Sequence, residues 1–274
     1  MFSPVTSLTR MAVEAMSGQY VYFVSDVHLG FGSRDRDRER EALLLRLLDR
    51  MSSNAAHLFI VGDLFDYWFD YRTVIPRGHV RTLAALAGLR EQGLPITYLM
   101  GNHDFGHFTY FHEELGITVV TGDVHADIAG SRFYIAHGDG KAHNDKGYLI
   151  LRSILRNRFA QRIYRMLHPN LGIGLAAHTS HGSRDYTTAR DFGPVDGIRD
   201  FAIEKIHEGY DVVVMGHRHR AMEERRPDGT YVNLGDWLGN DPTFGIFDPA
   251  TRIMSLGSVH EYLQSGLVYI APQQ

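Results

Sequence analysis

The chain has 274 residues, of which 44% are hydrophobic and 22% are charged, and its formal net charge is −4. These proportions exclude intrinsic disorder for most of the chain and suit one large globular domain or two small ones. The sequence contains no cysteine, which excludes disulfides, thiolate catalysis and Cys-ligated metal sites and leaves His, Asp, Asn and Glu as metal ligands.

The first residues show neither a clear structural pattern nor a targeting signal. No apolar run approaches the length that spans a bilayer, and Arg10 and Glu14 interrupt residues 1–20. We therefore expect neither a membrane helix nor a signal peptide, and hence a cytoplasmic protein. Residues 1–19 are expected to form an N-terminal extension that is poorly tied down.

Beyond residue 20 the hydrophobic pattern alternates between strand-like and helix-like segments. Strands are expected where β-branched and aromatic residues cluster, at 20–24, 57–61, 96–100, 117–120, 132–136 and 211–215. Amphipathic spacing predicts helices at 39–48, 80–92 and 198–207. Strand patterns at 231–234, 243–247 and 253–256 are separated by turn residues and predict an antiparallel end. The alternation predicts an α/β fold.

The stretch 141–184 differs from the rest of the chain because it holds eight basic residues and one acidic residue. Apolar residues recur in it at steps of three and four, at Leu151, Ile154, Leu155, Phe159, Ile163 and Met166. This pattern predicts a basic amphipathic helix inserted between two strand blocks. The helix either packs on the core with a solvated charged side, or forms a lid that contacts anionic lipid or a lipid-bearing, negatively charged substrate.

Polar clusters follow five of the predicted strands. The clusters contain Asp26 and His28, then Asp63, then Asn102 and His103, then His137, and finally His217 and His219. Because the carboxyl ends of strands in an α/β sheet meet at one edge, we expect these side chains to converge. Oxygen and imidazole ligands suit Mn²⁺, Fe²⁺, Zn²⁺ or Ni²⁺ better than Ca²⁺. Each cluster alone could be a turn with a capping side chain.

The ordered set of clusters is more specific than its parts. It reads Asp26-x-His28, Gly62-Asp63-x-x-Asp66, Gly101-Asn102-His103-Asp104, His137-Gly138-Asp139 and Gly216-His217-x-His219. This set resembles the calcineurin-like metallophosphoesterase family over most of the chain after Tyr20. The resemblance implies a four-layer α-β-β-α sandwich of two mixed sheets, formed by residues 20–274, with a helical cap inserted at about 141–190.

The resemblance also implies roles for individual residues. One divalent ion would be held by Asp26, His28, Asp63 and His219, and a second by Asp63, Asn102, His137 and His217. Both ions are expected to be Mn²⁺, with Asp63 bridging them, and such a pair activates a hydroxide for attack on phosphorus. His103, next to Asp104, would stabilise the transition state or protonate the leaving group, unless it is only an outer histidine. Asp66 and Asp139 would orient the loops behind the ligands.

Within that superfamily the chain is most similar to the UDP-2,3-diacylglucosamine pyrophosphohydrolases of lipid A biosynthesis. The likeness lies in residues 62–68, 137–140 and 145–148 and in the arginine-rich insertion that follows. It implies hydrolysis of the diphosphate to UMP and 2,3-diacylglucosamine 1-phosphate, and peripheral attachment of the cap to the anionic inner face of the cell membrane. Substrate contacts are expected from Asn102, His103, Asp145 and Tyr148, although helix capping by Asp145 and apolar packing by Tyr148 are alternatives. The best-studied branch has arginine where this chain has His103, which indicates a sister branch.

Two other classes of function remain open. A different calcineurin-like phosphodiesterase or phosphatase would act on a water-soluble phosphoester and would not need a basic amphipathic cap. A binding protein without catalysis would be expected to have lost metal ligands, whereas every ligand position is filled here. Nucleic-acid binding is not expected, because the basic residues are concentrated in one segment. The sequence does not predict an oligomeric state.

Overall fold

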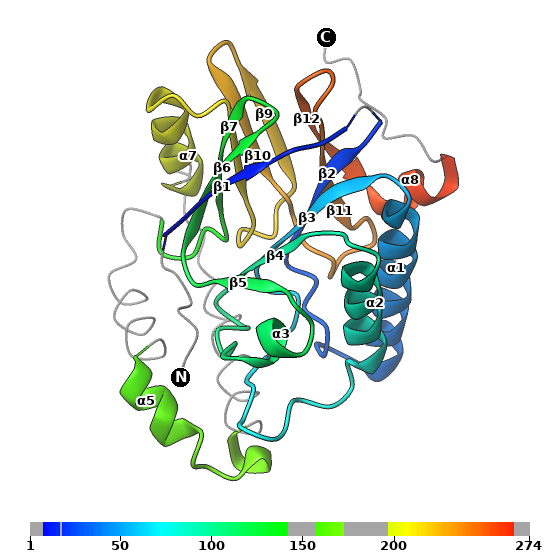
Figure 1. Cartoon of the computed structure of the whole chain (residues 1–274), viewed down its shortest axis with the longest axis vertical. Coiled ribbons are helices and arrows are strands. Elements are labelled where there is room, and N and C mark those ends of the chain that lie inside the picture. Colours follow the sequence, from blue (N-terminus) through cyan, green and yellow to red (C-terminus); the bar gives the residue numbers. More distant parts are fainter. Residues whose placement is uncertain (1–7, 17, 142–156, 173–196, 266–274) are drawn as a thin grey trace.

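Two mixed six-stranded sheets lie at the centre of the computed structural model, which describes residues 8–16, 18–141, 157–172 and 197–265 (Figure 1). Sheet A has the spatial order β1 (Leu8–Val13), β6 (Asp123–Ile128), β7 (Ser131–Ala136), β8 (Val212–Met215), β10 (Gly229–Asn233) and β9 (Met222–Arg226). Sheet B has the order β12 (Ile253–Ser258), β11 (Thr243–Asp248), β2 (Tyr20–Val24), β3 (Ala55–Val61), β4 (Ile96–Leu99) and β5 (Thr118–Val120). The strands β2 to β5 pair in parallel, and so do β7, β8 and β10.

Helices cover the outer face of each sheet, while the inner faces pack on each other. The inner layer joins Phe23 and Phe59 of sheet B to Phe133 and Val214 of sheet A. On the outer face of sheet B lie α1 (Arg34–Ser52), α2 (Val80–Glu91) and α8 (Val259–Ser265), and α7 (Gly197–His207) lies against sheet A. The described chain is thus the expected α-β-β-α sandwich; of two short helices, α3 (Tyr110–Glu113) packs Phe111 into the core that lies beneath α1 and α2, and α5 (Arg158–Tyr164) lies outside the layers.

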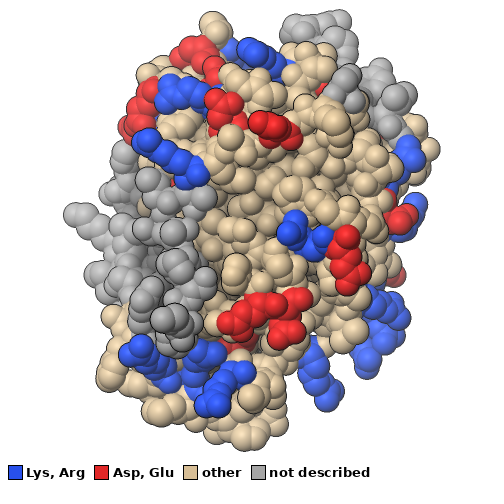
Figure 2. Space-filling model, viewed as in Figure 1, with Lys and Arg blue, Asp and Glu red and all other residues tan. Residues whose placement is uncertain are grey.

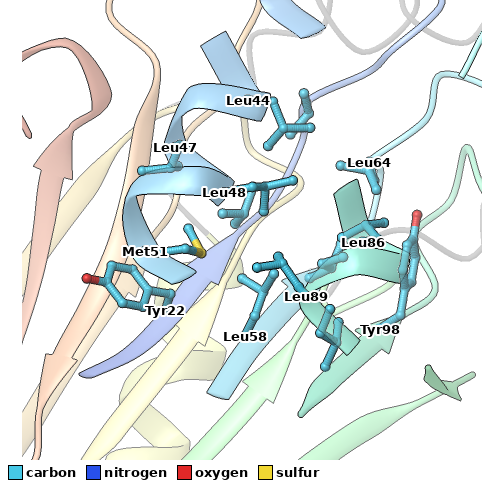
Figure 3. Close-up of a cluster of buried hydrophobic side chains, with 14 of the residues drawn as sticks. Tyr22, Leu44, Leu47, Leu48, Met51, Leu58, Leu64, Leu86, Leu89 and Tyr98 are labelled. Atoms are coloured by element: carbon cyan, nitrogen blue, oxygen red, sulfur yellow. The ribbon is translucent and has the colours of Figure 1, made fainter. Parts of the chain in front are cut away.

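The helix layer on sheet B is fixed by leucine side chains. Leu44 and Leu48 of α1 and Leu86 and Leu89 of α2 point onto β2, β3 and β4 (Figure 3). Each buried leucine contributes roughly 2 kcal/mol of hydrophobic free energy. The helix α1 begins at Arg34, five residues before the predicted start, because the Ser33 side chain caps it by accepting the Arg36 N–H.

Several sequence expectations need correction. Residues 8–13 are not loosely held, because they form β1 and pair in parallel with β6 along six residues. The predicted antiparallel end is divided between the two sheets, since β9 and β10 pair in sheet A whereas β11 and β12 pair in sheet B. The strand β9 went unpredicted because Met222–Arg226 is mostly charged, as suits a strand at the edge of a sheet.

Only part of the basic insertion belongs to the described residues. Within it, Arg158–Tyr164 form α5, and the predicted apolar positions Leu151, Ile154 and Leu155 lie outside the described residues. Among all helices of the described ranges, none is both long and apolar enough to cross a membrane.

Three histidines are buried in the core away from the polar clusters. Their lowered pKa values predict that the folded protein loses stability in acid. Burial lowers the pKa of His107 to about 3, and it lowers that of His57 and of His79 to about 4. The unfolded chain therefore binds more protons than the folded chain between about pH 4 and 6.5, so stability falls as the pH drops through that window.

We expect His107→Leu to remove part of this pH dependence, because the His107 ring lies among Trp68, Tyr98 and Phe111 and leucine cannot be protonated. Urea unfolding at pH 7 and 4.5 should show the wild type losing on the order of 2 kcal/mol more than the variant. Parallel losses in the two proteins would contradict a buried neutral His107.

Candidate metal centre

All of the predicted metal ligands lie at the carboxyl ends of strands from both sheets. Asp26 and His28 follow β2, Asp63 follows β3, and Asn102 follows β4 in sheet B. His137 follows β7 and the pair His217 and His219 follows β8 in sheet A. The two sheets pack with these ends together, so residues almost 200 positions apart in sequence come into contact.

The first half of the centre contains Asp26, His28 and His219. Their ligand atoms lie within 4.8 Å of one another. The Nε2 atoms of His28 and His219 are 3.1 Å apart, and Asp26 Oδ1 is 3.3 Å from His219 Nε2 and 3.8 Å from His28 Nε2. Three donor atoms thus point at one small volume, as they would around a cation.

The second half contains Asp63, Asn102, His137 and His217. Asp63 Oδ2 is 3.2 Å from His137 Nε2, and Asn102 Oδ1 is 3.0 Å from His137 Nε2 and 2.8 Å from His217 Nδ1. The same Asp63 oxygen is 4.0 Å from His28 Nε2 in the first half. Asp63 therefore lies between the two groups, which is the place of a bridging ligand.

The backbone at the ligands is strained. Five of the predicted ligands, Asp26, His28, Asp63, His217 and His219, have φ between +52° and +68°, a region that non-glycine residues rarely adopt. Glycines give the ligands room, because a Cβ on Gly101 would lie 2.0 Å from Asp63 Oδ1 and one on Gly216 would lie 2.3 Å from Asp26 Oδ2. Strain of this kind is typical of functional sites.

Hydrogen bonds hold the ligands at this geometry. The His217 N–H donates to Asp26 Oδ2 at 3.0 Å, and the His103 N–H donates to Asp63 Oδ1 at 2.8 Å. The Nδ1 atom of His137 lies 2.9 Å from the Val61 carbonyl oxygen, which can only accept, so Nδ1 carries a proton. This contact points Nε2 of His137 at Asp63 and Asn102.

The electrostatics of the cluster fit a divalent cation. Asp26 Oδ1 and Asp63 Oδ2 are buried and face imidazole nitrogens at 3.2 to 4.0 Å, and a buried carboxylate is costly unless positive charge lies beside it. Burial alone would raise the pKa of each carboxyl, but His219 and His28 beside Asp26, and His137 and His103 beside Asp63, hold both well below the usual range. Two ionised carboxylates, an amide oxygen and four imidazoles are a ligand set for such an ion.

Neighbouring charge acts differently on two of these histidines. Burial would lower the pKa of His137, but the Asp63 carboxylate outweighs burial and raises it to about 10. At His217, burial and the charge of His137 outweigh the attraction of the Asp139 carboxylate and lower the pKa to about 4.

Asp66 lies beside the His103 ring, where the sequence suggested Asp104. Nδ1 of His103 lies 3.7 Å from Asp66 Oδ1, and the same oxygen is 3.5 Å from Nδ1 of His28. Asp104 is buried and accepts the N–H groups of Leu64 and Gly101 and the Tyr98 hydroxyl. It therefore ties together the loops after β3 and β4, while Asp66 lies between two histidines of the site.

The remaining predicted site residues have different outcomes. Asp139 is buried, and its charge contributes to the raised pKa of His137, so it lies behind that ligand. Asp145 and Tyr148, the predicted substrate contacts in the insertion, lie outside the described residues. Of the aromatic run after Asp63, Trp68 and Phe69 are core residues and Tyr67 is only partly buried.

Asp236 is a site residue that the sequence analysis missed. Its Oδ2 is 3.5 Å from Nδ1 of His219, and its Oδ1 accepts the N–H of Leu238 at 2.8 Å. The turn that carries Asp236 is held beside the site because the Trp237 N–H donates to the Asp26 carbonyl at 3.1 Å. Gly235-Asp236 directly follows the predicted strand 231–234, as Gly62-Asp63 follows the strand that ends at Val61, and this repeated pattern could have revealed it.

We expect Asp236→Asn to weaken metal binding about 10- to 100-fold, because the carboxylate orients the ring whose Nε2 faces Asp26. Isothermal titration of Mn²⁺ into chelator-treated protein measures the effect. Asp241→Asn is the matched control, since Asp241 belongs to the same connection but accepts from Ser258 instead. Equal affinities in the two variants would exclude the orienting role.

Comparison with known proteins places this site in context. The family model described as calcineurin-like phosphoesterase matches residues 20–221. A UDP-2,3-diacylglucosamine hydrolase of Porphyromonas gingivalis is 31% identical over 85% of this chain and 96% of its own length. Proteins of the same name from Haemophilus influenzae and Neisseria gonorrhoeae are 26% and 29% identical, over 81% and 79% of this chain and 92% and 89% of their own.

Proposed function

This chain belongs to the calcineurin-like phosphoesterase family and is an enzyme, and from that premise we propose that it hydrolyses the diphosphate of UDP-2,3-diacylglucosamine. The products are UMP and 2,3-diacylglucosamine 1-phosphate. The observation that carries this proposal is the match to relatives named for that substrate over most of both chains. Residues 20–274 form the catalytic domain in this proposal, with the cap at about 141–190.

The converging side chains at the strand ends support a two-ion site. Asp26, His28, Asp63 and His219 would hold one divalent ion, and Asp63, Asn102, His137 and His217 the other. When bound, a pair of divalent ions supplies Lewis acidity for cleavage of a phosphorus–oxygen bond. We expect Mn²⁺ to be the activating ion.

His103 and Asn102 are the proposed substrate contacts beside the ions. The His103 N–H donates to the Asp63 carboxylate, and the His103 ring faces Asp66. These contacts fix the position of His103 relative to the proposed ligands. From this place the imidazole can donate a hydrogen bond to a phosphoryl oxygen or a proton to the departing oxygen. The Asn102 amide can contact the same phosphoryl group.

The lipid part of the proposed substrate would contact the segment around α5. Three large apolar side chains there are mostly exposed to solvent: Phe159 (70%), Met166 (79%) and Leu171 (68%). Positive side chains gather over the same place (Figure 2). Exposed apolar and cationic groups together suit acyl chains and an anionic lipid surface. We therefore propose peripheral attachment to the inner face of the cell membrane.

The test of the reaction is UMP release from UDP-2,3-diacylglucosamine in detergent micelles, followed by mass spectrometry with Mn²⁺ or with chelator. Bis(4-nitrophenyl) phosphate serves as a small diester for comparison. Metal-dependent UMP release with poor diester turnover is the expected result. Rapid diester cleavage without UMP would favour the alternative, a phosphodiesterase or phosphatase with a water-soluble substrate.

Membrane attachment predicts a salt-sensitive effect of charge at α5. We expect Arg162→Glu to weaken binding to liposomes containing anionic phospholipid about 30-fold, since each charge near such a surface contributes about 1 kcal/mol and the reversal changes the charge by two units. Co-sedimentation measures the binding. Arg50→Glu, in the last turn of α1, is the control and should bind as the wild type does. Unchanged binding of Arg162→Glu would remove the proposed lipid contact.

A further inference from the structure

The residues 157–172, called here the α5 segment, are attached to the core through the side chain of Tyr164. Its hydroxyl donates to the Gly172 carbonyl at 2.6 Å and lies 3.1 Å from the Tyr67 hydroxyl. Because the single Tyr164 proton is used on Gly172, the Tyr67 hydroxyl must be the donor to Tyr164. The Tyr164 ring also packs on Phe69, with ring centroids 4.6 Å apart.

Two further contacts hold the α5 segment on the core. The Arg165 guanidinium lies over the Phe108 ring, 4.4 Å from its centroid. Gly172 is buried, and a Cβ there would lie 2.2 Å from the Tyr71 hydroxyl. The α5 segment therefore sits directly on the two loops that carry Tyr67 to Tyr71 and Phe108.

These are the same loops that carry ligands of the candidate metal centre. Tyr67 lies four residues after Asp63 in the loop that follows β3, and Phe108 lies six residues after Asn102 in the loop that follows β4. Asp70 joins the loops, because its carboxylate accepts the Phe108 N–H at 2.8 Å. The loops thus form one platform, with ligands at one end and the α5 segment on the other.

We infer that Tyr164 is a positioning residue that determines substrate specificity, by fixing the α5 segment relative to the metal centre. This inference rests on the proposed function. A lipid-bearing diphosphate must reach Phe159 and Met166 while its phosphorus is at the metal centre. Its binding therefore depends on a fixed distance between the α5 segment and that centre. A small diester contacts only the centre and does not depend on that distance.

Tyr164→Phe tests the inference, because it keeps the ring on Phe69 and removes both hydroxyl contacts. We expect KM for UDP-2,3-diacylglucosamine to rise about 5- to 10-fold with little change in kcat, which is the signature of lost substrate binding. Turnover of bis(4-nitrophenyl) phosphate should stay within about twofold of the wild type. Hydrogen–deuterium exchange of residues 157–172 should become faster.

Two further variants sharpen the result. Tyr210→Phe is the matched control, since its hydroxyl bonds His125 on the sheet A side, and it should change neither substrate. Tyr67→Phe should reproduce most of the effect of Tyr164→Phe, because both variants break the Tyr67–Tyr164 hydrogen bond, whereas only Tyr164→Phe also loses the bond to Gly172 within the segment. The double variant should be no worse than Tyr164→Phe, because it breaks no further contact between the loop and the segment.

The inference is overturned if Tyr164→Phe changes both substrates equally or changes neither. It is also overturned if exchange of the α5 segment stays at the wild-type rate. Absence of UMP release by the wild-type protein would refute the proposed function alone. In that case the attachment is still decided by exchange, where faster exchange in Tyr164→Phe than in Tyr210→Phe supports it and equal exchange refutes it.

Discussion

Asp63→Asn is expected to lower kcat about 10³-fold or more while the protein stays folded. Asp63 lies between the two ligand groups, 3.2 Å from His137 Nε2 and 4.0 Å from His28 Nε2, so its loss affects both proposed ions. Loss of the charge stabilisation that a metal pair supplies is worth several kcal/mol in the transition state, and about 4 kcal/mol corresponds to 10³-fold. UMP release and metal content per chain measure the effect.

The fold should survive because asparagine has nearly the same shape and can repeat the contacts. Its Oδ1 can accept the His103 N–H, and its Nδ2 can donate to Nε2 of a His137 ring that is protonated on Nδ1. Far-ultraviolet circular dichroism and thermal unfolding check this. Asp127→Asn is the control, since Asp127 is exposed and accepts the Gly130 N–H in the turn after β6. Near-normal turnover by Asp63→Asn would falsify the two-ion assignment.

His103→Gln is expected to lower kcat about 10²- to 10⁴-fold, the usual contribution of a positioned acid or hydrogen-bond donor. The glutamine amide keeps the size of the ring and the backbone bond to Asp63, but it cannot transfer a proton. Metal content should stay at the wild-type value, because His103 is assigned to the substrate and not to either ion. Parallel assays of UMP release and bound metal test both statements.

The metal measurement matters because His103 also lies with His28 and Asp63 in a group that could itself hold an ion. A fall in bound metal in His103→Gln would make His103 a ligand and contradict its assigned role. His112→Gln, an exposed histidine on α3, is the control and should leave both readings unchanged.

The sequence predicted which side chains converge, because polar residues that follow the strands of an α/β fold meet at one edge of the sheets. Short polar motifs after apolar runs, such as Asp26-x-His28 and Gly216-His217-x-His219, carry their chemistry locally and can be read without coordinates. Segments with a strong hydrophobic periodicity could also be predicted, because that pattern lies in their own residues. The strand β2, for example, matches its predicted bounds of 20–24. The alternation of strands and helices was sufficient for the α/β class.

Elements whose stability comes from partners could not be read in this way. The strand β1 exists because β6 offers it a parallel edge, and β9 exists because it pairs with β10 and its side chains Glu223 and Arg225 bond to the backbone of β12. Their own residues are too polar or too irregular to predict a strand. Likewise, the similar patterns of the last four strands could not reveal that they divide between two sheets.

Contacts between loops were decided by the tertiary structure alone. Adjacency in sequence suggested Asp104 as the partner of His103, but the backbone turns Asp104 toward Leu64 and Gly101 and brings Asp66 to the ring. Asp236 reaches His219 only because the Trp237 N–H binds the Asp26 carbonyl. The sequence specifies which side chain stands at each position. The residue that this side chain contacts depends on the direction of the backbone, which the whole packed fold imposes.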